Sequence, residues 1–255
     1  MITWSLVLNN VYRCASKLGK FDRGHMSKDR GTSRPVVPLR LLSGAAAIVA
    51  ALTVVSVASA THPYDSIYPT ANANWTCGSG GGTPTPGDVY CQTDGTSMSF
   101  WIGGHASTSE VGQIRSVLYH EYDDTVLNPF EVATAVWHAP GTGETDLILD
   151  EVEMDNYYPG LGVLGAAWCD DAIDSSVCDQ HYAFLDNDVT PHHGGTGFTM
   201  NACHEIGHTV GLTHPVNAAP SQLNGDSRFR CMNQGIYSWT GPGDNNKHQI
   251  DLVYG

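Results

Sequence analysis

Basic residues are scarce in this sequence. Its 255 residues include 12 Lys and Arg against 26 Asp and Glu, a formal net charge of -14. Eight of the 12 basic residues lie in the first 60 positions beside two acidic ones, so residues 61–255 carry four basic and 24 acidic side chains, a net charge of -20. Because such a surface repels the phosphate backbone of nucleic acid, that class of partner is excluded.

The sequence also lacks internal repeats and any sign of a second folded domain. Charged residues make up only 15% of the chain and hydrophobic residues 41%, a composition that is typical of globular proteins and excludes a disordered chain. Residues 61–255 are enough to build one sizeable core.

The first 60 residues have the three parts of a secretory signal peptide. A basic region precedes an uncharged apolar run over residues 41–60, which ends in V-A-S-A, a small-residue end of the A-x-A kind. This pattern predicts cleavage after Ala60 and a secreted, extracellular protein without a membrane contact. Met26 is a candidate for the true start, because residues 26–60 alone keep all three parts. The absence of two adjacent arginines favours the general secretory route.

An alternative stays open for residues 41–60. About 20 apolar residues are enough to span a bilayer, so the run could instead be a retained anchor that tethers the protein to a membrane. The small-residue end, with no polar or basic stop after it, favours the cleaved signal peptide.

A short stretch, H-E-I-G-H-T-V-G-L-T-H over residues 204–214, has the spacing of a zinc site. In a helix His204 and His208 lie one turn apart on the same face, so both imidazoles can reach one ion. Gly211 allows a sharp left-handed turn that would bring back His214 as a third ligand. Three protein ligands leave a fourth position open, which is typical of a catalytic zinc, and Glu205 stands beside the ion as a candidate general base.

This stretch resembles the H-E-x-x-H-x-x-G-x-x-H signature of the metzincin metallopeptidases. Metzincins also have a methionine in a tight turn below the zinc, and Met232 in C-M-N-Q-G (residues 231–235) matches it. The last six residues, I-D-L-V-Y-G, resemble the end of a matrixin domain. Gln234 departs from astacins and serralysins, which carry a tyrosine ligand two residues after this methionine. The resemblance is therefore to metzincins, with a matrixin-like leaning.

The resemblance implies both a fold and an activity for residues 96–255. The fold is of the α/β (α+β) class: a twisted, mainly parallel five-stranded sheet with an antiparallel edge strand, an active-site helix, the methionine turn and a C-terminal helix. The activity is that of a secreted zinc endopeptidase with one catalytic Zn²⁺, acting on protein or peptide substrates that pair with the edge strand, here residues 162–168. We expect a monomer. The alternative is a secreted zinc-containing binding module, an inhibitor or adhesin, although such a module has no need of Glu205.

Periodicity predicts the elements of this domain. Residues 96–102 alternate as a strand, and Ser107 with Glu110 forms a capping box that starts a helix reaching Tyr122. Further strands are expected at 131–137, 146–153, 162–168 and 181–185, the zinc helix from about Thr199, and a closing helix over 244–253 with Ile250, Val253 and Tyr254 on its inner side.

Six cysteines lie in residues 61–255, and fifteen connectivities are open to them. Local spacing favours three pairs: Cys77–Cys91, Cys169–Cys178 and Cys203–Cys231. The last pair would tie the zinc helix to the methionine turn. The first would clasp residues 61–95, a Gly/Pro-rich N-terminal extension. The alternative for Cys77 is a zinc-blocking role like that of the matrixin propeptide cysteine, of whose P-R-C-G-x-P-D segment only the Cys-Gly pair is present.

Other side chains raise metal hypotheses. Several Asp and Asn residues offer hard oxygen ligands suited to a structural Ca²⁺, although no spacing among them matches a known calcium loop. They are Asp170, Asp171, Asp174, Asp179, Asp186, Asn187 and Asp188. His192 and His193 could cover the cleft or bind a metal, and the competing interpretation is a pair of surface histidines. The ligands of a second, structural zinc cannot be placed, so none is predicted. The resemblance to metzincins implies that residues 236–242 form a wall of the substrate pocket, where Ile236, Tyr237 and Trp239 suggest an apolar preference.

Overall fold

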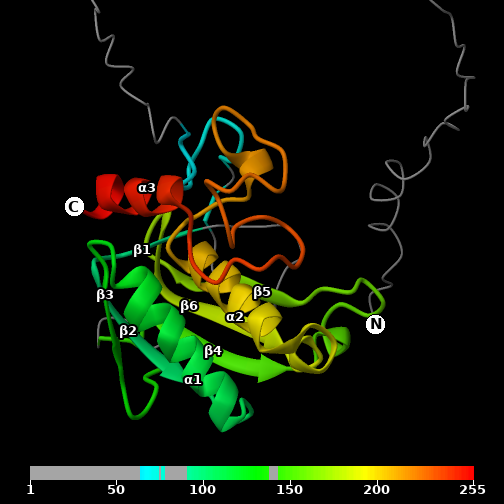
Figure 1. Cartoon of the computed structure of the whole chain (residues 1–255). Coiled ribbons are helices and arrows are strands. Elements are labelled where there is room, and N and C mark those ends of the chain that lie inside the picture. Colours follow the sequence, from blue (N-terminus) through cyan, green and yellow to red (C-terminus); the bar gives the residue numbers. More distant parts are fainter. Residues whose placement is uncertain (1–63, 75, 78–90, 138–142) are drawn as a thin grey trace, which may run out of the picture. The chain divides into compact units, whose positions relative to one another are not determined.

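A mixed sheet of six strands forms one layer of the molecule (Figure 1). The computed structural model describes residues 64–74, 76–77, 91–137 and 143–255. The strands run in the order β1-β6-β4-β2-β3, and β5 pairs with β6 outside this path. Every pairing is parallel except β5 with β6, which is antiparallel. The strands are β1 (Gln92–Thr93), β2 (Ser97–Ile102), β3 (Asn128–Glu131), β4 (Leu147–Val152), β5 (Gly165–Ala172) and β6 (Val177–Asp186).

The expected fold class, α/β with a mainly parallel sheet and one antiparallel edge strand, is confirmed. The sheet has one strand more than the five that we expected. The additional strand, β1, is two residues long and pairs with Val177 and Cys178 of β6. Its shortness explains why the alternation of the sequence gave no sign of it.

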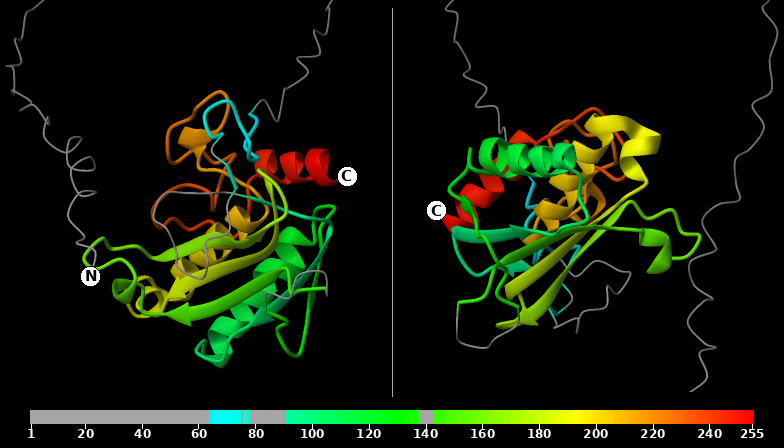
Figure 2. Two further views of the ribbon diagram at one scale, coloured as in Figure 1. Left: turned by 180° about the vertical axis from the view of Figure 1, so that it is seen from behind. Right: turned by 90° about the horizontal axis from the view of Figure 1, so that it is seen from below.

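Helices α1 (Thr108–Ser116) and α2 (Val189–Thr209) lie on one face of this sheet (Figures 1 and 2). The main core fills the space between these layers, and residues of β2, β4, β6 and both helices are fully buried in it. They include Met98, Phe100, Leu147, Leu149, Leu185, Ile114, Cys203 and Ile206. Burying this apolar surface is the main term that stabilises the layered arrangement.

Helix α1 begins as expected. The side chain of Ser107 accepts a hydrogen bond from the backbone N–H of Glu110, and the Glu110 carboxylate accepts one from the N–H of Ser107. A π-helical turn, η1 (Val117–Tyr122), extends the helix and buries Tyr122. The hydroxyl of Tyr122 donates to the carbonyl of Cys203, which joins this turn to α2.

Two strand predictions need correction. In place of the strand expected at 131–137, the sheet contains β3, which ends at Glu131. The N–H of Val132 donates the last hydrogen bond between β3 and β2, to the carbonyl of Phe100, and the chain then leaves the sheet. Pro129 within β3 has no N–H, which an edge strand tolerates because only one side needs donors. The strand expected at 162–168 is β5, which starts three residues later at Gly165 because Gly160 and Gly162 adopt positive φ in the preceding turn.

The remaining elements carry the C-terminal half. Helix α2 is kinked at Gly194, where φ is 70° and ψ is 179°, so the segment expected from about Thr199 is the straight part after the kink. Helix α3 (Asp244–Tyr254) buries Ile250 as expected, but Val253 is 42% exposed and its expected inward position is wrong. The buried stripe runs from Asn246 through Ile250 to Tyr254 at intervals of four residues, which turns residue 253 outward. Two short 3₁₀ turns, η2 (Met154–Asn156) and η3 (Pro215–Asn217), complete the fold.

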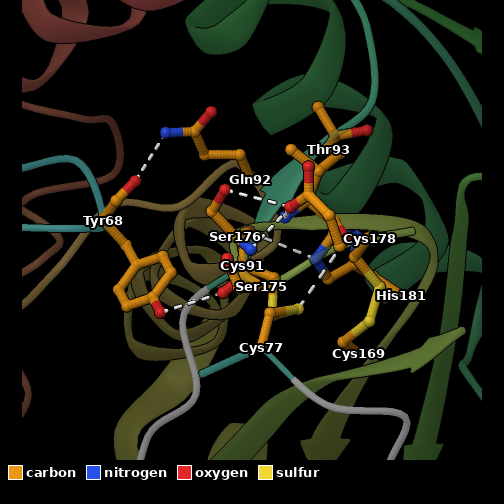
Figure 3. Close-up of a disulfide and its surroundings, with 12 residues drawn as sticks. Tyr68, Cys77, Cys91, Gln92, Thr93, Cys169, Ser175, Ser176, Cys178 and His181 are labelled. Atoms are coloured by element: carbon orange, nitrogen blue, oxygen red, sulfur yellow. Dashed lines mark hydrogen bonds between the residues drawn. A yellow bond between two sulfur atoms is a disulfide. The ribbon is translucent and has the colours of Figure 1, made fainter. Parts of the chain in front are cut away.

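All three expected disulfides, Cys77–Cys91, Cys169–Cys178 and Cys203–Cys231, are present. The first two lie beside each other in one buried cluster, together with His181, whose Nε2 lies 3.2 Å from the carbonyl oxygen of Cys91 (Figure 3). Cys77 is therefore a disulfide partner in this structure, and the alternative of a zinc-blocking cysteine is not realised.

The described part of the N-terminal extension packs on the chain that follows α2. Tyr68 donates its N–H to the carbonyl of Gly211, and Thr213 donates to the carbonyl of Ser66. The predicted export segment, residues 1–60, lies outside the described residues, as does the apolar run within it. Within the described part of the chain, no helix combines the length and the apolar character that a membrane crossing requires.

Candidate metal centre

Three histidines converge at the end of α2. His204 and His208 lie one helical turn apart, with 3.0 Å between their Nε2 atoms. The helix ends at Thr209, and Gly211 adopts the expected left-handed conformation with a φ of 82°. This turn brings the Nε2 atom of His214 to 2.9 Å from that of His204 and 3.2 Å from that of His208. The spacing of the three histidines in the sequence thus places their Nε2 atoms around one point.

The far nitrogens of two of these rings are held by backbone carbonyls. Nδ1 of His204 lies 2.6 Å from the carbonyl oxygen of Cys231, and Nδ1 of His208 lies 2.8 Å from that of Leu212. A carbonyl oxygen can only accept, so each Nδ1 carries the ring proton, and each Nε2 presents its lone pair to the centre. Such partners of the non-ligating nitrogen are typical of histidine ligands to zinc.

Burial keeps these rings uncharged. It lowers the pKa of His204 to about 4, and it lowers those of His208 and His214 well below the ordinary histidine value, with further lowering by the neighbouring rings. Neutral rings with converging lone pairs repel one another at about 3 Å unless a cation lies among them. The donor set therefore fits Zn²⁺, which binds imidazole nitrogen at about 2.0–2.1 Å and needs the neutral form.

Glu205 lies next to this centre in a cleft of about 320 Å³. The residues around the cleft come from the start of β5 and the segment before it, from α2 and the turn that follows it, and from the turn after Met232. They are Gly162, Val163, Leu164, Gly165, Met200, Asn201, His204, Glu205, His214, Gln234, Gly235 and Ile236. The side chain of Glu205 packs against Gly165, where an added Cβ would stand 2.8 Å from its Oε1 atom. Glycine at this point of β5 thus leaves room for the carboxylate between helix and strand.

Met232 packs against the turn of α2 that carries His204 and His208. It is fully buried against Gly207, at which an added Cβ would stand 2.3 Å from the Met232 sulfur. Two backbone hydrogen bonds close the turn: the N–H of Met232 donates to the carbonyl of Phe229, and the N–H of Asn233 donates to the carbonyl of Arg230. Gly235 follows with a positive φ of 94°. The adjacent Cys203–Cys231 disulfide ties this turn to α2.

Sequence reasoning missed two side chains that support the centre. The Gln234 amide nitrogen lies 3.3 Å from Nδ1 of His214, and Asn224 holds Gln234 through a side-chain bond of 3.1 Å and a backbone bond of 3.2 Å. In the sequence, Gln234 stands out only because astacins and serralysins carry a tyrosine ligand at that position. Its polar side chain was the signal that could have indicated a contact with the centre. The spacing of Tyr122 in the sequence indicates only a core residue. In the structure its hydroxyl donates to the carbonyl of Cys203, the residue just before His204.

The calcium hypothesis stays a prediction, and the structure brings only some of its residues together. Two groups of carboxylates bring ligand oxygens within 4.8 Å of one another, and Asp179 belongs to both. The first also contains Asp94 and Asp146, and the second contains Glu144 and Asp171. Of the seven expected residues, only Asp171 and Asp179 are in these groups. Asp174 instead accepts the N–H groups of Ser176 and Val177 in a turn, and Asp186 accepts that of Met154. His192 and His193 are exposed near the start of α2 and belong to neither group.

Comparisons with known proteins give little further information. No family model and no curated protein sequence matches the chain. Among solved structures, one described as the structure of myroilysin is 10% identical, covers 65% of this chain and 95% of its own, and has a TM-score of 0.36. A second, described as a crystal structure of myroilysin, is 12% identical, covers 74% and 75%, and has a TM-score of 0.28. A similarity of this extent supports no conclusion about function.

Proposed function

We propose that this protein is a secreted zinc-dependent endopeptidase. The observation that carries the proposal is the convergence of the Nε2 atoms of His204, His208 and His214 beside Glu205, within an open cleft. The ligands are His204, His208 and His214, and the catalytic residue is Glu205. The export segment at residues 1–60 and the three disulfides support secretion through an oxidising compartment.

The chemistry follows from this donor set. A zinc ion held by three neutral imidazoles supplies a Lewis acid for the scissile carbonyl and lowers the pKa of a water molecule to about 7. Glu205, fixed between α2 and Gly165, accepts a proton from the attacking water. The same carboxyl group then donates that proton to the leaving amine. Tight packing around Glu205 keeps it in one position for both transfers.

The substrate would be a protein or peptide in extended form. Strand β5 pairs only with β6 among the described strands, and Leu164 and Gly165 at its start border the cleft. A peptide added along this free edge would be held by main-chain hydrogen bonds, largely irrespective of its sequence. Ile236 on the opposite wall favours an apolar side chain next to the scissile bond. We propose a monomeric enzyme with residues 96–255 as its catalytic domain.

The test is cleavage of unfolded casein by residues 61–255, with Glu205→Gln as the matched variant and zinc measured in both proteins. We expect the wild type to cleave casein, the variant to lose at least a hundredfold in rate, and both to hold about one zinc per chain. Equal cleavage by both would remove Glu205 from the mechanism. Zinc in both proteins with cleavage in neither would favour the alternative, a secreted binding module.

A further inference from the structure

Asn201 lines the metal cleft, although the reaction proposed above makes no use of it. It lies on α2, three residues before His204 and four before Glu205, so it shares a helix face with both. Only 5% of its surface is exposed. Its side-chain amide nitrogen donates a hydrogen bond of 2.7 Å to the carbonyl oxygen of Leu164, in the segment before β5. A buried amide of the active-site helix is thus bonded to the opposite wall of the cleft.

The carbonyl of Leu164 accepts a second hydrogen bond from a different layer of the molecule. This bond comes from the N–H of Asp186, at the end of β6, over 2.8 Å. A carbonyl oxygen has two lone pairs and can accept both. One bond ties Leu164 to the sheet and the other ties it to α2. Together they fix the direction in which this carbonyl points.

The direction of the Leu164 carbonyl also sets that of the next N–H group. A trans peptide unit is planar, so the N–H of Gly165 points opposite to the Leu164 carbonyl. The register agrees, because Leu164 and Asp186 form a hydrogen-bonded pair, which makes the following pair, Gly165 with Leu185, a non-hydrogen-bonded one. The N–H of Gly165 therefore points away from β6 to the outer edge of β5, where no described strand pairs with it.

Gly165 lies directly beside the proposed reacting groups. A Cβ added to it would stand 2.7 Å from Cγ of Glu205, and it borders the cleft together with His204 and His214. A peptide that pairs with the outer edge of β5 at this residue has its main chain next to the metal centre. The same helix thus carries Glu205 and, through Asn201, holds the strand segment that such a peptide would contact.

We propose that Asn201 is a positioning residue, which holds the Leu164–Gly165 peptide unit so that the N–H of Gly165 donates to one main-chain carbonyl of the bound peptide. The inference rests on the proposed function and adds a residue to its substrate site. The bonds that the Leu164 carbonyl accepts also polarise the peptide unit, which strengthens Gly165 as a donor. Without the amide of Asn201, this donor loses both alignment and strength.

The test combines a change in the protein with a change in the peptide. The probe is a peptide of seven alanines around one central leucine, between a fluorophore and a quencher. In its analogues an alkene, which has no carbonyl, replaces one amide at a time, except the amide that is cut. We expect one analogue to lose about fivefold or more in kcat/KM with the wild type and less than about twofold with Asn201→Leu. A merely structural role would lower kcat/KM for probe and analogue alike and leave their ratio unchanged.

Thr199→Val is the matched control on the same helix. The Thr199 hydroxyl lies 3.1 Å from the side-chain oxygen of Gln113 in α1, and Thr199 is not among the residues that line the cleft. The ratio of probe to analogue should stay as in the wild type. Asn201→Ala repeats the test with a smaller side chain, so the outcome does not depend on whether leucine fits. An equal loss in the wild type and in both Asn201 variants overturns the proposal, as does a series in which no analogue loses activity.

Binding separates this proposal from that of the enzyme itself. Fluorescence anisotropy of the labelled probe and of its analogues is measured with Glu205→Gln, alone and combined with Asn201→Leu. A loss of affinity on alkene replacement that is present in the single variant and shrinks in the double variant supports the role of Asn201 even if no peptide is cut. The same loss in both variants, or no loss in either, overturns it, whether or not the wild type cleaves casein.

Discussion

Met232 packs directly below Gly207, the glycine between the two histidines of α2. A Cβ on Gly207 would stand 2.3 Å from the Met232 sulfur and 2.8 Å from the Tyr122 hydroxyl oxygen. Three segments that are far apart in the sequence, η1, α2 and the turn at 231–235, thus meet at a residue without a side chain. This contact joins the turn at 231–235 to the helical turn that carries His204 and His208.

Gly207→Ala should therefore disturb both stability and metal affinity. The added methyl group has no space, and overpacking of this kind costs about 1–3 kcal/mol. We expect a lower midpoint in urea and a weaker zinc affinity in competition with a chromogenic chelator. Gly112→Ala in α1 is the matched control, because nothing lies within 4 Å of its added Cβ and alanine stabilises a helix by about 0.5–1 kcal/mol over glycine. Equal effects of the two substitutions would contradict the contact.

Gln234 should affect the zinc affinity of the centre through its contact with His214. The amide nitrogen of Gln234 lies 3.3 Å from Nδ1 of His214, and its oxygen accepts from Asn224. If Nε2 of His214 binds zinc, Nδ1 carries the proton, so the amide must turn its oxygen toward His214 and give up the bond from Asn224. Gln234→Leu removes that acceptor and should weaken zinc binding about 10- to 100-fold. Gln234→Glu places a stronger acceptor there and should bind zinc at least as tightly as the wild type. The measurement is the zinc dissociation constant by chelator competition, and a leucine variant that binds like the wild type would remove the role.

Stability should fall as the pH rises through neutrality. The pKa of Glu151 is raised from 4.5 to about 7 in the folded protein, so folding favours its protonated form. Its contribution is complete below pH 4.5 and is lost as the pH approaches and passes 7. Glu151→Gln should flatten this part of the profile and gain about 1–2 kcal/mol at pH 8, since partial solvent access reduces the full value. Urea unfolding between pH 5 and 8 is the measurement, and parallel profiles would refute the assignment.

The carboxylates around Asp179 allow a direct test of the calcium expectation. After chelation, calcium at about 100 times its dissociation constant would stabilise the fold by about 2.7 kcal/mol, a rise in Tm of about 5–11 °C. Asp179→Asn should abolish that rise, because Asp179 belongs to both groups, whereas Asp174→Asn should keep it. A Tm that calcium leaves unchanged in the chelated wild type would remove calcium from the account of this protein.

The sequence by itself determined which three histidines come together in the centre. His204 and His208 at an interval of four residues must share a helix face, and a glycine at 211 permits the turn toward His214. These are local relations, set by helix geometry and by the freedom of one backbone position. Local spacing likewise predicted the three disulfides and the capping box at Ser107.

Only the tertiary structure decided which distant groups support that centre. The carbonyls of Cys231 and Leu212 that orient two histidines, the amide of Gln234 and the hydroxyl of Tyr122 come from segments whose approach no periodicity encodes. The ends of β3 and β5 were misplaced because they depend on the partner strand and the preceding turn. The pairing of Glu151 with Glu110 arises only when β4 packs against α1, because burial and charge are properties of the assembled layers.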